Sequence, residues 1–190
     1  MACNERVQTS EEVIDQQSSV NDVDTVQNEF EEVGLGADLA TCISIHNQVY
    51  PIDLPFKANF VLDKYEGYFP LEDDEKVSFS LDKAGLDIGS EIYLEGFMEL
   101  SMDYLSYVFV TYPSQNEIST YLVTYEPDYT FADALEIGYD EAAEGFTFKE
   151  STIDSHGIQM KVSTYFEEEE IEQSNYVISE TGKISPRDTP

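Results

Sequence analysis

Residues 158–166 of this chain read Ile-Gln-Met-Lys-Val-Ser-Thr-Tyr-Phe, and this stretch decides the fold. From Ile158 to Phe166 every second side chain is apolar or β-branched, and the side chains between them are mostly polar. A period of two is typical of a strand with one face buried and the other in water, as in antiparallel sheets. The sequence therefore predicts a mainly β protein.

The sequence around this stretch predicts hairpins. Residues 146–148 (Phe-Thr-Phe) precede it, and residues 154–157 (Asp-Ser-His-Gly) provide a turn between the two strands. Residues 107–112 are β-branched and aromatic, which favours an interior strand. Residues 113–116 then break that strand, and residues 118–125 return beside it.

A weak internal echo predicts two similar hairpins in one sheet. Residues 121–131 and residues 176–184 each consist of a short strand, a tight turn and the start of another strand. The turns contain Glu-Pro-Asp in the first copy and Thr-Gly in the second.

The charge of the chain is strongly one-sided. Its 190 residues include 40 Asp and Glu against 9 Lys and Arg, for a formal net charge of -31. Between Lys83 and Lys149 there are 13 acidic residues and no basic one. Such a surface repels nucleic acid and attracts basic proteins. The hydrophobic content of 41%, with 13 Tyr and 11 Phe, still provides apolar surface for a folded core.

The chain is predicted to contain one folded domain and a tail. Residues 1–37 are polar and acidic, which is typical of a disordered tail or tether. Residues 38–190 are predicted to form a single antiparallel sheet, a sandwich or a partly open barrel. The acidic run at residues 167–172 indicates a solvated loop between strands, with docking to a basic site as the alternative.

Residues 90–103 are ambiguous. Apolar side chains at even positions and carboxylates at odd positions indicate a strand, yet acids four residues apart would also line up on a helix. Gly96 in the middle favours the strand, since glycine costs a helix about 1 kcal/mol. A strand would present an acidic and aromatic face outward. The residues predicted to bind a partner there are Glu91, Tyr93, Glu95, Phe97, Glu99, Asp103, Tyr104 and Tyr107.

The residue types that catalysis and metal binding require are present but poorly arranged. His46 follows Ile-Ser-Ile and is predicted to end a strand. Residues 154–156 (Asp-Ser-His) have the types of a catalytic triad, but consecutive side chains are expected to point apart. Residues 72–75 (Glu-Asp-Asp-Glu) lack the spacing of a calcium loop, so we predict a solvated loop. We predict no enzyme activity, no cofactor and no metal.

Five segments toward the C-terminus carry a resemblance. They alternate short strands with turns and span residues 120–125, 133–138, 145–148, 158–162 and 176–184. Together they resemble the C-terminal half of small uncharacterised lipoproteins of Bacteroidota. The resemblance implies a β-rich body and an acylated cysteine near the mature N-terminus, and it implies no catalytic residue.

Cys3 is the cysteine to which this resemblance points. Residues 1–4 (Met-Ala-Cys-Asn) are what would remain if a bacterial lipoprotein signal were removed and a start codon placed before the acceptor cysteine. We therefore predict lipidation of Cys3 and a place in the bacterial cell envelope, periplasmic or at the surface. The alternative is an ordinary cysteine in a cytoplasmic protein.

These observations favour a non-catalytic protein that docks or neutralises a basic protein surface, as immunity proteins and inhibitors do. One alternative is a DNA-mimic antagonist, in which carboxylates take the place of phosphates against a nucleic-acid-binding protein. Another is a surface lipoprotein with a structural or ligand-capture role.

Overall fold

The structure is a computed structural model, and it describes residues 37–58, 69–114, 116–141, 146–165 and 169–187. The predicted acidic tail, residues 1–37, lies outside this part except for Ala37, which begins the first helix. Cys3 also lies outside it. None of the described helices is both long and apolar enough to cross a membrane.

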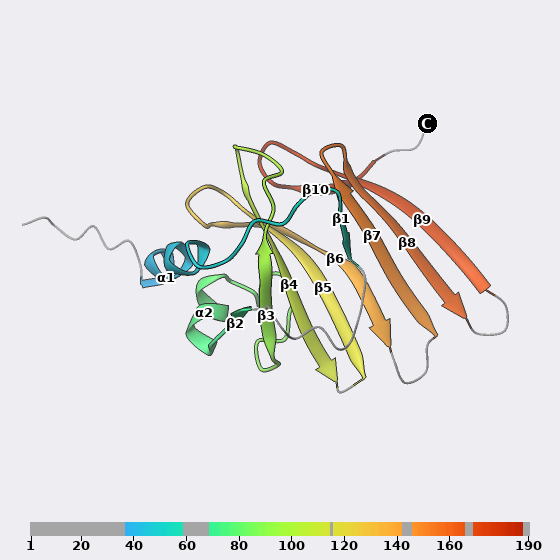
Figure 1. The fold of residues 1–190 in the computed structure, drawn as a ribbon, viewed down its shortest axis with the longest axis horizontal. Helices are drawn as coiled ribbons and strands as arrows, with labels where there is room; N and C mark the ends of the chain where they lie inside the picture. Colours follow the sequence, from blue (N-terminus) through green and yellow to red (C-terminus); the bar gives the residue numbers. More distant parts are fainter. Residues whose placement is uncertain (1–36, 59–68, 115, 142–145, 166–168, 188–190) are drawn as a thin grey trace, which may run out of the picture. The chain divides into compact units, whose positions relative to one another are not determined.

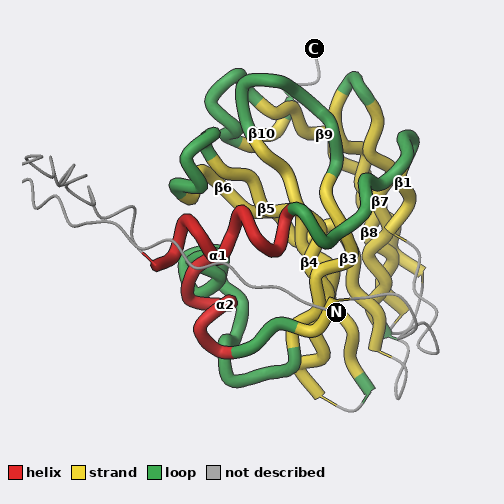
Figure 2. The backbone as a smooth tube through the Cα atoms, turned by 60° about the vertical axis from the view of Figure 1, so that its left-hand side comes forward, coloured by secondary structure: helices red, strands yellow, loops and turns green. Residues whose placement is uncertain are grey.

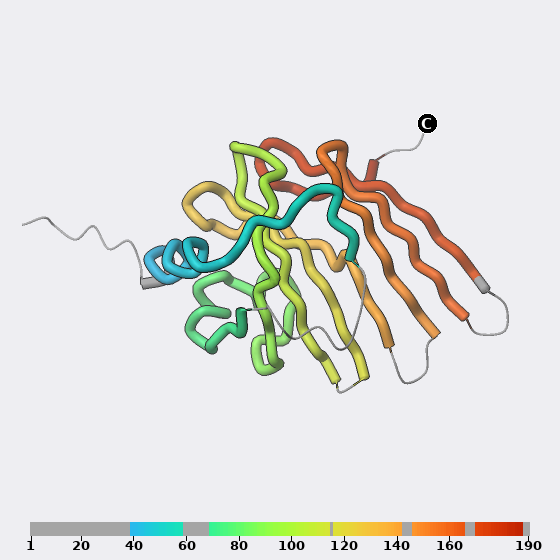
Figure 3. Tube along the Cα trace, in the orientation of Figure 1, coloured from blue at the N-terminus to red at the C-terminus, as the bar shows by residue number. Residues whose placement is uncertain are grey.

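The described strands form one antiparallel sheet, and the prediction of a mainly β fold is confirmed. The sheet runs in the order β10-β9-β8-β7-β6-β5-β4-β3-β2 and does not close into a barrel (Figure 1). The trace in Figure 3 follows the same order in colour. The strands are β1 (Phe56–Ala58), β2 (Phe69–Pro70), β3 (Ile92–Phe97), β4 (Leu105–Ser114), β5 (Glu117–Tyr125), β6 (Phe131–Glu141), β7 (Thr147–Asp154), β8 (Gly157–Tyr165), β9 (Glu169–Ile178) and β10 (Ile184–Pro186).

The predicted hairpins are confirmed. Strands β7 and β8 pair from Thr147↔Thr164 to Asp154↔Gly157, with Ser155 and His156 in the turn. Strands β4 and β5 pair antiparallel on either side of the predicted break. The register of β8 buries Ile158 and Met160 and exposes Gln159 between them, as the period of two predicts. Beyond Met160 the pattern is lost, because Val162 is half-buried and Ser163 on the other face is buried.

The internal echo is confirmed as two turns of the same geometry. The backbone N–H of Glu126 donates to the carbonyl of Thr130 at 2.8 Å, and that of Ser179 donates to the carbonyl of Lys183 at 2.8 Å. Tyr129, with φ of 66°, stands where the second turn has Gly182, with φ of 77°. Left-handed backbone is easy for glycine and strained for tyrosine, so a specific contact must hold Tyr129 in place.

The structure contains two helices that the sequence analysis did not predict (Figure 2). Helix α1 (Ala37–His46) includes His46, so the prediction of a strand end there is wrong. Its buried side chains, Cys42 and Ile45, are three residues apart, the spacing of one helix face. Burial of this face against the sheet outweighs the low helix propensity of β-branched residues.

Helix α2 (Asp73–Ser78) corrects the predicted loop at residues 72–75. Glu72 and Glu75 form a reciprocal capping box, in which the backbone N–H of Glu72 donates to Glu75 Oε2 at 2.8 Å. Carboxylates in a first helical turn also favour the positive end of the helix dipole. These acids therefore begin a helix.

The strand pairing tests two further predictions. The strand predicted within residues 90–103 is confirmed as β3, but it ends at Phe97 and carries an irregularity between Leu94 and Gly96. The loop predicted over residues 167–172 is wrong from Glu169 onward, because β9 begins there and pairs with β8.

The first core lies between the two helices and the sheet, and aromatic rings fill it. The ring centroid of Phe79 lies 5.5 Å from Tyr107, 5.5 Å from Phe109 and 5.9 Å from Tyr125. Edge-to-face pairs of this kind contribute about 0.5–1.5 kcal/mol each beyond their buried area. Tyr125 donates its hydroxyl to the carbonyl of Phe79 at 2.8 Å, which joins α2 to the sheet.

A chain of hydrogen bonds explains why Tyr129 tolerates its strained backbone. His46 Nδ1 lies 2.7 Å from the hydroxyl of Tyr107, which donates to the hydroxyl of Tyr129 at 3.1 Å. Burial raises the pKa of Tyr107, and the bond to Tyr129 raises it further. The phenol therefore stays neutral, and the chain ties α1 to the β5–β6 turn.

The second core forms where β6 and β7 separate. These strands pair only at Tyr139↔Lys149 and Asp140↔Phe148, and β1 then pairs with β7 as far as Ile153. The cluster takes side chains from β4, β5 and β6 as well as from β1, β7 and β8. Its buried members are Ala58, Met98, Val108, Leu122, Ile137, Ile153 and Ile158.

Candidate functional site

The predicted partner-binding residues do not form one face. Glu91 and Tyr93 lie together at the start of β3, where the Tyr93 hydroxyl donates to Glu91 Oε2 at 3.2 Å. The ring of Tyr93 meets the ring of Tyr112 edge-on, with centroids 5.9 Å apart. Glu95, half-buried, lies within β3 at its irregularity.

Two predicted members of that face belong to the interior, and a third, Phe97, is half-buried. Tyr107 has 0% exposure and Tyr104 has 7%, so the expectation that these side chains contact a partner is wrong. Phe97 packs against His46, with ring centroids 4.6 Å apart. Tyr107 lies inside because β4 is buried on both faces from Ser106 to Thr111. Glu99 and Asp103 are exposed but lie outside the strand, in the β3–β4 connection.

A different group of carboxylates and tyrosines does share one face. The β5–β6 acidic face, as we name it, projects from two paired strands. In the register, Glu117 lies opposite Glu141, Ser119 lies opposite Tyr139, and Tyr121 lies opposite Glu136. Directly opposed residues project to the same side of a sheet. The members of the face are Glu117, Tyr121, Glu136, Tyr139 and Glu141.

The tyrosines of this face have raised pKa values, because they are partly buried and carboxylates surround them. The Tyr139 hydroxyl donates to Glu117 Oε1 at 3.3 Å. Burial raises the pKa of Tyr139 to about 12, together with the charges of Glu117, Glu141 and Glu136. Burial, followed by the charge of Glu136, also raises the pKa of Tyr121. A phenolate is disfavoured beside carboxylates, so both rings remain neutral hydrogen-bond donors.

One lysine compensates only part of this charge. Lys149 on β7 forms an ion pair with Glu136, and both side chains are about three-quarters buried. Within the described residues, no ion pair includes Glu117 or Glu141. Two like charges directly opposed across strands destabilise a sheet. This position therefore holds two opposed carboxylates that form no ion pair within the described residues.

Sequence reasoning missed this face because strand register creates it. Glu117 and Glu141 are 24 positions apart and become neighbours only through the β5–β6 pairing. The irregularity between Thr120 and Tyr121 then sets which β6 side chains lie beside Tyr121. The alternation of β5 was visible in the sequence, but its partner strand was not.

The Asp154, Ser155 and His156 turn has closer contacts than its sequence suggested. Ser155 Oγ lies 3.3 Å from His156 Nδ1, and Asp154 Oδ1 lies 3.5 Å from the same nitrogen. The expectation that these side chains point apart is therefore wrong. A triad needs its serine and its carboxylate on opposite nitrogens of the imidazole, whereas both lie at Nδ1 here. The turn lines a hollow of about 220 Å³ together with Tyr104 and Glu180.

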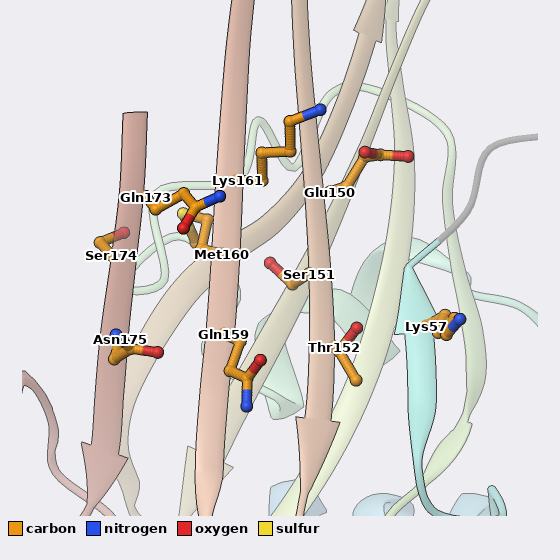
Figure 4. Close-up of a pocket in the computed structure, with 10 residues that line it drawn as sticks. All are labelled: Lys57, Glu150, Ser151, Thr152, Gln159, Met160, Lys161, Gln173, Ser174 and Asn175. Carbon is orange, nitrogen blue, oxygen red and sulfur yellow. The ribbon is translucent and has the colours of Figure 1, made fainter. Parts of the chain in front are cut away.

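A polar groove crosses β1, β7, β8 and β9 (Figure 4). It encloses about 320 Å³. One row in the register joins Lys57, Thr152, Gln159 and Asn175, and the next joins Glu150, Lys161 and Gln173. Amides, hydroxyls and two lysines dominate its floor, so it differs in charge from the β5–β6 acidic face.

No described cluster of three or more His, Cys, Asp or Glu side chains has the arrangement of a metal site. Comparison with protein families, with curated proteins and with solved structures finds no match to this chain.

Proposed function

We propose that this protein is a non-catalytic binding protein that docks a basic protein surface through the β5–β6 acidic face. The observation that carries the proposal is the directly opposed pair of Glu117 and Glu141, which form no ion pair within the described residues. A like-charged pair costs stability in the protein alone. A cationic side chain from a partner would remove that cost.

The tyrosines supply the second requirement of such a site. Tyr121 and Tyr139 are half-buried on adjacent strands, so their rings are held by the sheet before a partner arrives. Rigid aromatic side chains lose little entropy on binding and are frequent at the centres of interfaces. Carboxylates around them steer a basic partner toward the face and raise the association rate.

Capture of partners at low salt tests this proposal. The full chain is immobilised, and proteins that it retains at about 0.02 M salt are compared with those retained at about 0.3 M, where screening is strong. We expect basic proteins that are released as salt rises. Glu117→Gln combined with Glu141→Gln removes two charges from the face. Asp82→Asn combined with Glu126→Gln removes the same charge from exposed positions elsewhere.

The outcomes separate the proposed function from its alternatives. Loss of the basic protein with the first variant and retention with the second supports the proposal. Equal retention by both variants contradicts it. Release of the captured protein by duplex DNA, at an ionic strength that otherwise preserves binding, favours the DNA-mimic alternative instead.

The envelope location stays a proposal of its own. We propose that Cys3 carries the lipid anchor, as the resemblance to lipoproteins implies. Mass spectrometry of the protein isolated from its native cells tests this, because acylation adds a defined mass to the N-terminal peptide. An unmodified Cys3 would contradict the proposal and leave the binding function unaffected.

A further inference from the structure

The two ends of the sheet differ in how their edges are covered. At one end, β2 pairs with Tyr93 and Leu94 of β3. Backbone bonds from Leu71 and Ile52 then cover Ile92 and Phe97. This edge is closed along the length of β3, which is how proteins commonly prevent unwanted strand pairing.

Among the described residues, little pairs with the other end of the sheet. β10 pairs with β9 only at Tyr176, Val177 and Ile178, and the N–H of Arg187 donates to the carbonyl of Asn175 at 2.7 Å. No described strand pairs with β9 on this side before Asn175. β9 is the outermost long strand of the sheet in Figure 1.

The register shows which backbone groups face outward. The carbonyl of Asn175 points away from β8, because it accepts the N–H of Arg187. In an antiparallel strand, alternate residues direct both N–H and C=O to the same side. Gln173 and Ile171 therefore direct their N–H and C=O groups outward, where they can form a ladder with another strand.

The side chains of this edge define which strand fits. Ile171 is 50% exposed and lies on the same face as Gln173, while the exposed carboxylates of Glu170 and Glu172 lie on the other face. An added strand would place side chains opposite both sets. Lysine or arginine complements the carboxylates, and an apolar residue between them covers Ile171.

We infer that the outer edge of β9, from Glu170 to Ser174, accepts an extended strand of alternating basic and apolar residues from the partner. The added strand extends the sheet by backbone hydrogen bonds, and the carboxylates select its charge. A second copy of this chain is disfavoured there, because it would bring Glu170 and Glu172 against like charges. This inference rests on the proposed function, since it assigns a second contact to the same basic partner.

Synthetic peptides test the inference with the full chain. The probe is an acetylated, amidated peptide with four alternating Lys-Val pairs, and its control has four Lys followed by four Val. Both have the same composition and charge, so charge alone cannot distinguish them. We expect the alternating peptide to bind at least about tenfold more tightly, which corresponds to ~1.4 kcal/mol. Hydrogen exchange of the Ile171 and Gln173 amides should slow when it binds.

A matched pair of variants isolates the backbone contact. Gln173→Pro removes an outward N–H and leaves the pairing with β8 intact, since proline is tolerated at such edge positions. Gln173→Ala removes the same side chain and keeps the N–H. We expect the proline variant to lose the preference for the alternating peptide and the alanine variant to keep it. A circular dichroism melt of each variant shows that both are folded.

Each of the following results would overturn the inference. They are equal binding of the two peptides, equal binding by the two Gln173 variants, and slow exchange of the Ile171 and Gln173 amides in the protein alone. Concentration-dependent protection of these amides without peptide would identify a second copy as the occupant and also overturn it. If Gln173→Pro retains the captured basic partner while Glu117→Gln with Glu141→Gln loses it, the inference fails and the proposed function stands.

Discussion

Tyr107 and Tyr125 in the first core differ from Tyr121 and Tyr139 on the β5–β6 acidic face, although all four lie on β4, β5 or β6. The core pair has no exposed surface, and aromatic rings surround it. Tyr139 instead lies among carboxylates. Within β5, Tyr121 and Tyr125 even project to the same side of the sheet. The comparison teaches that the neighbouring strand and the covering helix decide whether a tyrosine stabilises the fold or serves a surface.

The largest effect is expected from a substitution in the aromatic core. Phe79→Ala removes the ring that contacts Tyr107, Phe109 and Tyr125. Loss of a buried aromatic ring costs about 3–5 kcal/mol of unfolding free energy. Urea denaturation measures this loss. A change below about 1 kcal/mol, within the range of ordinary surface substitutions, would show that the aromatic cluster does not stabilise the fold.

Two matched tyrosine substitutions compare the core with the β5–β6 acidic face. Tyr125→Phe leaves the buried carbonyl of Phe79 without its donor, which costs about 1–3 kcal/mol. Tyr139→Phe removes a hydroxyl from a partly solvated carboxylate and should cost less than about 0.5 kcal/mol. Thermal melts of the two variants provide the measurement. Equal losses of stability in the two variants would show that the core hydroxyl stabilises the protein no more than the hydroxyl on the β5–β6 acidic face.

Removal of one carboxylate from the face should stabilise the protein. Glu117→Gln relieves the repulsion with Glu141, and opposed like charges are worth about 0.2–1 kcal/mol. The gain should be largest at low salt and fade as salt is added, since screening weakens the repulsion. Chemical denaturation at two salt concentrations measures it. Destabilisation by Glu117→Gln at low salt would mean that the pair is compensated within the protein.

The smallest effect concerns the titration of Tyr139, whose pKa is raised to about 12. A raised pKa in the folded state adds stability that is fully present below the unfolded pKa of about 10. That stability is lost as pH rises from there through about 12. Ultraviolet absorbance of the phenolate follows the ionisation. Glu117→Gln should lower the pKa of Tyr139, and an unchanged titration would show that burial alone sets it.

The sequence was sufficient to predict the fold class and the hairpins, because both depend on local patterns. The alternation around Ile158 and Met160 determined β8, and the turn residues located the hairpin ends. Helix α1 was missed because its β-branched residues favour a strand locally, and only packing of Cys42 and Ile45 against the sheet makes it a helix.

The residues of the β5–β6 acidic face could not be predicted from the sequence. An acidic surface with tyrosines was expected from the composition. Glu91 and Tyr93 do form an exposed hydrogen-bonded pair. Tyr107 was assigned to the partner-binding face although residues 107–112 were also predicted to be an interior strand, and both faces of β4 are buried around it. The opposed pair of Glu117 and Glu141 depends on pairing between strands, which local periodicity does not contain.

The most direct test of the account is the association rate of the captured basic partner with the full chain at low salt. For Glu117→Gln with Glu141→Gln, we expect the rate to fall by about tenfold, within the range of electrostatic steering. For Asp82→Asn with Glu126→Gln, which carries the same net charge, we expect a change below about twofold. Equal slowing by the two variants would show that only total charge matters, and would contradict a binding role for the β5–β6 acidic face.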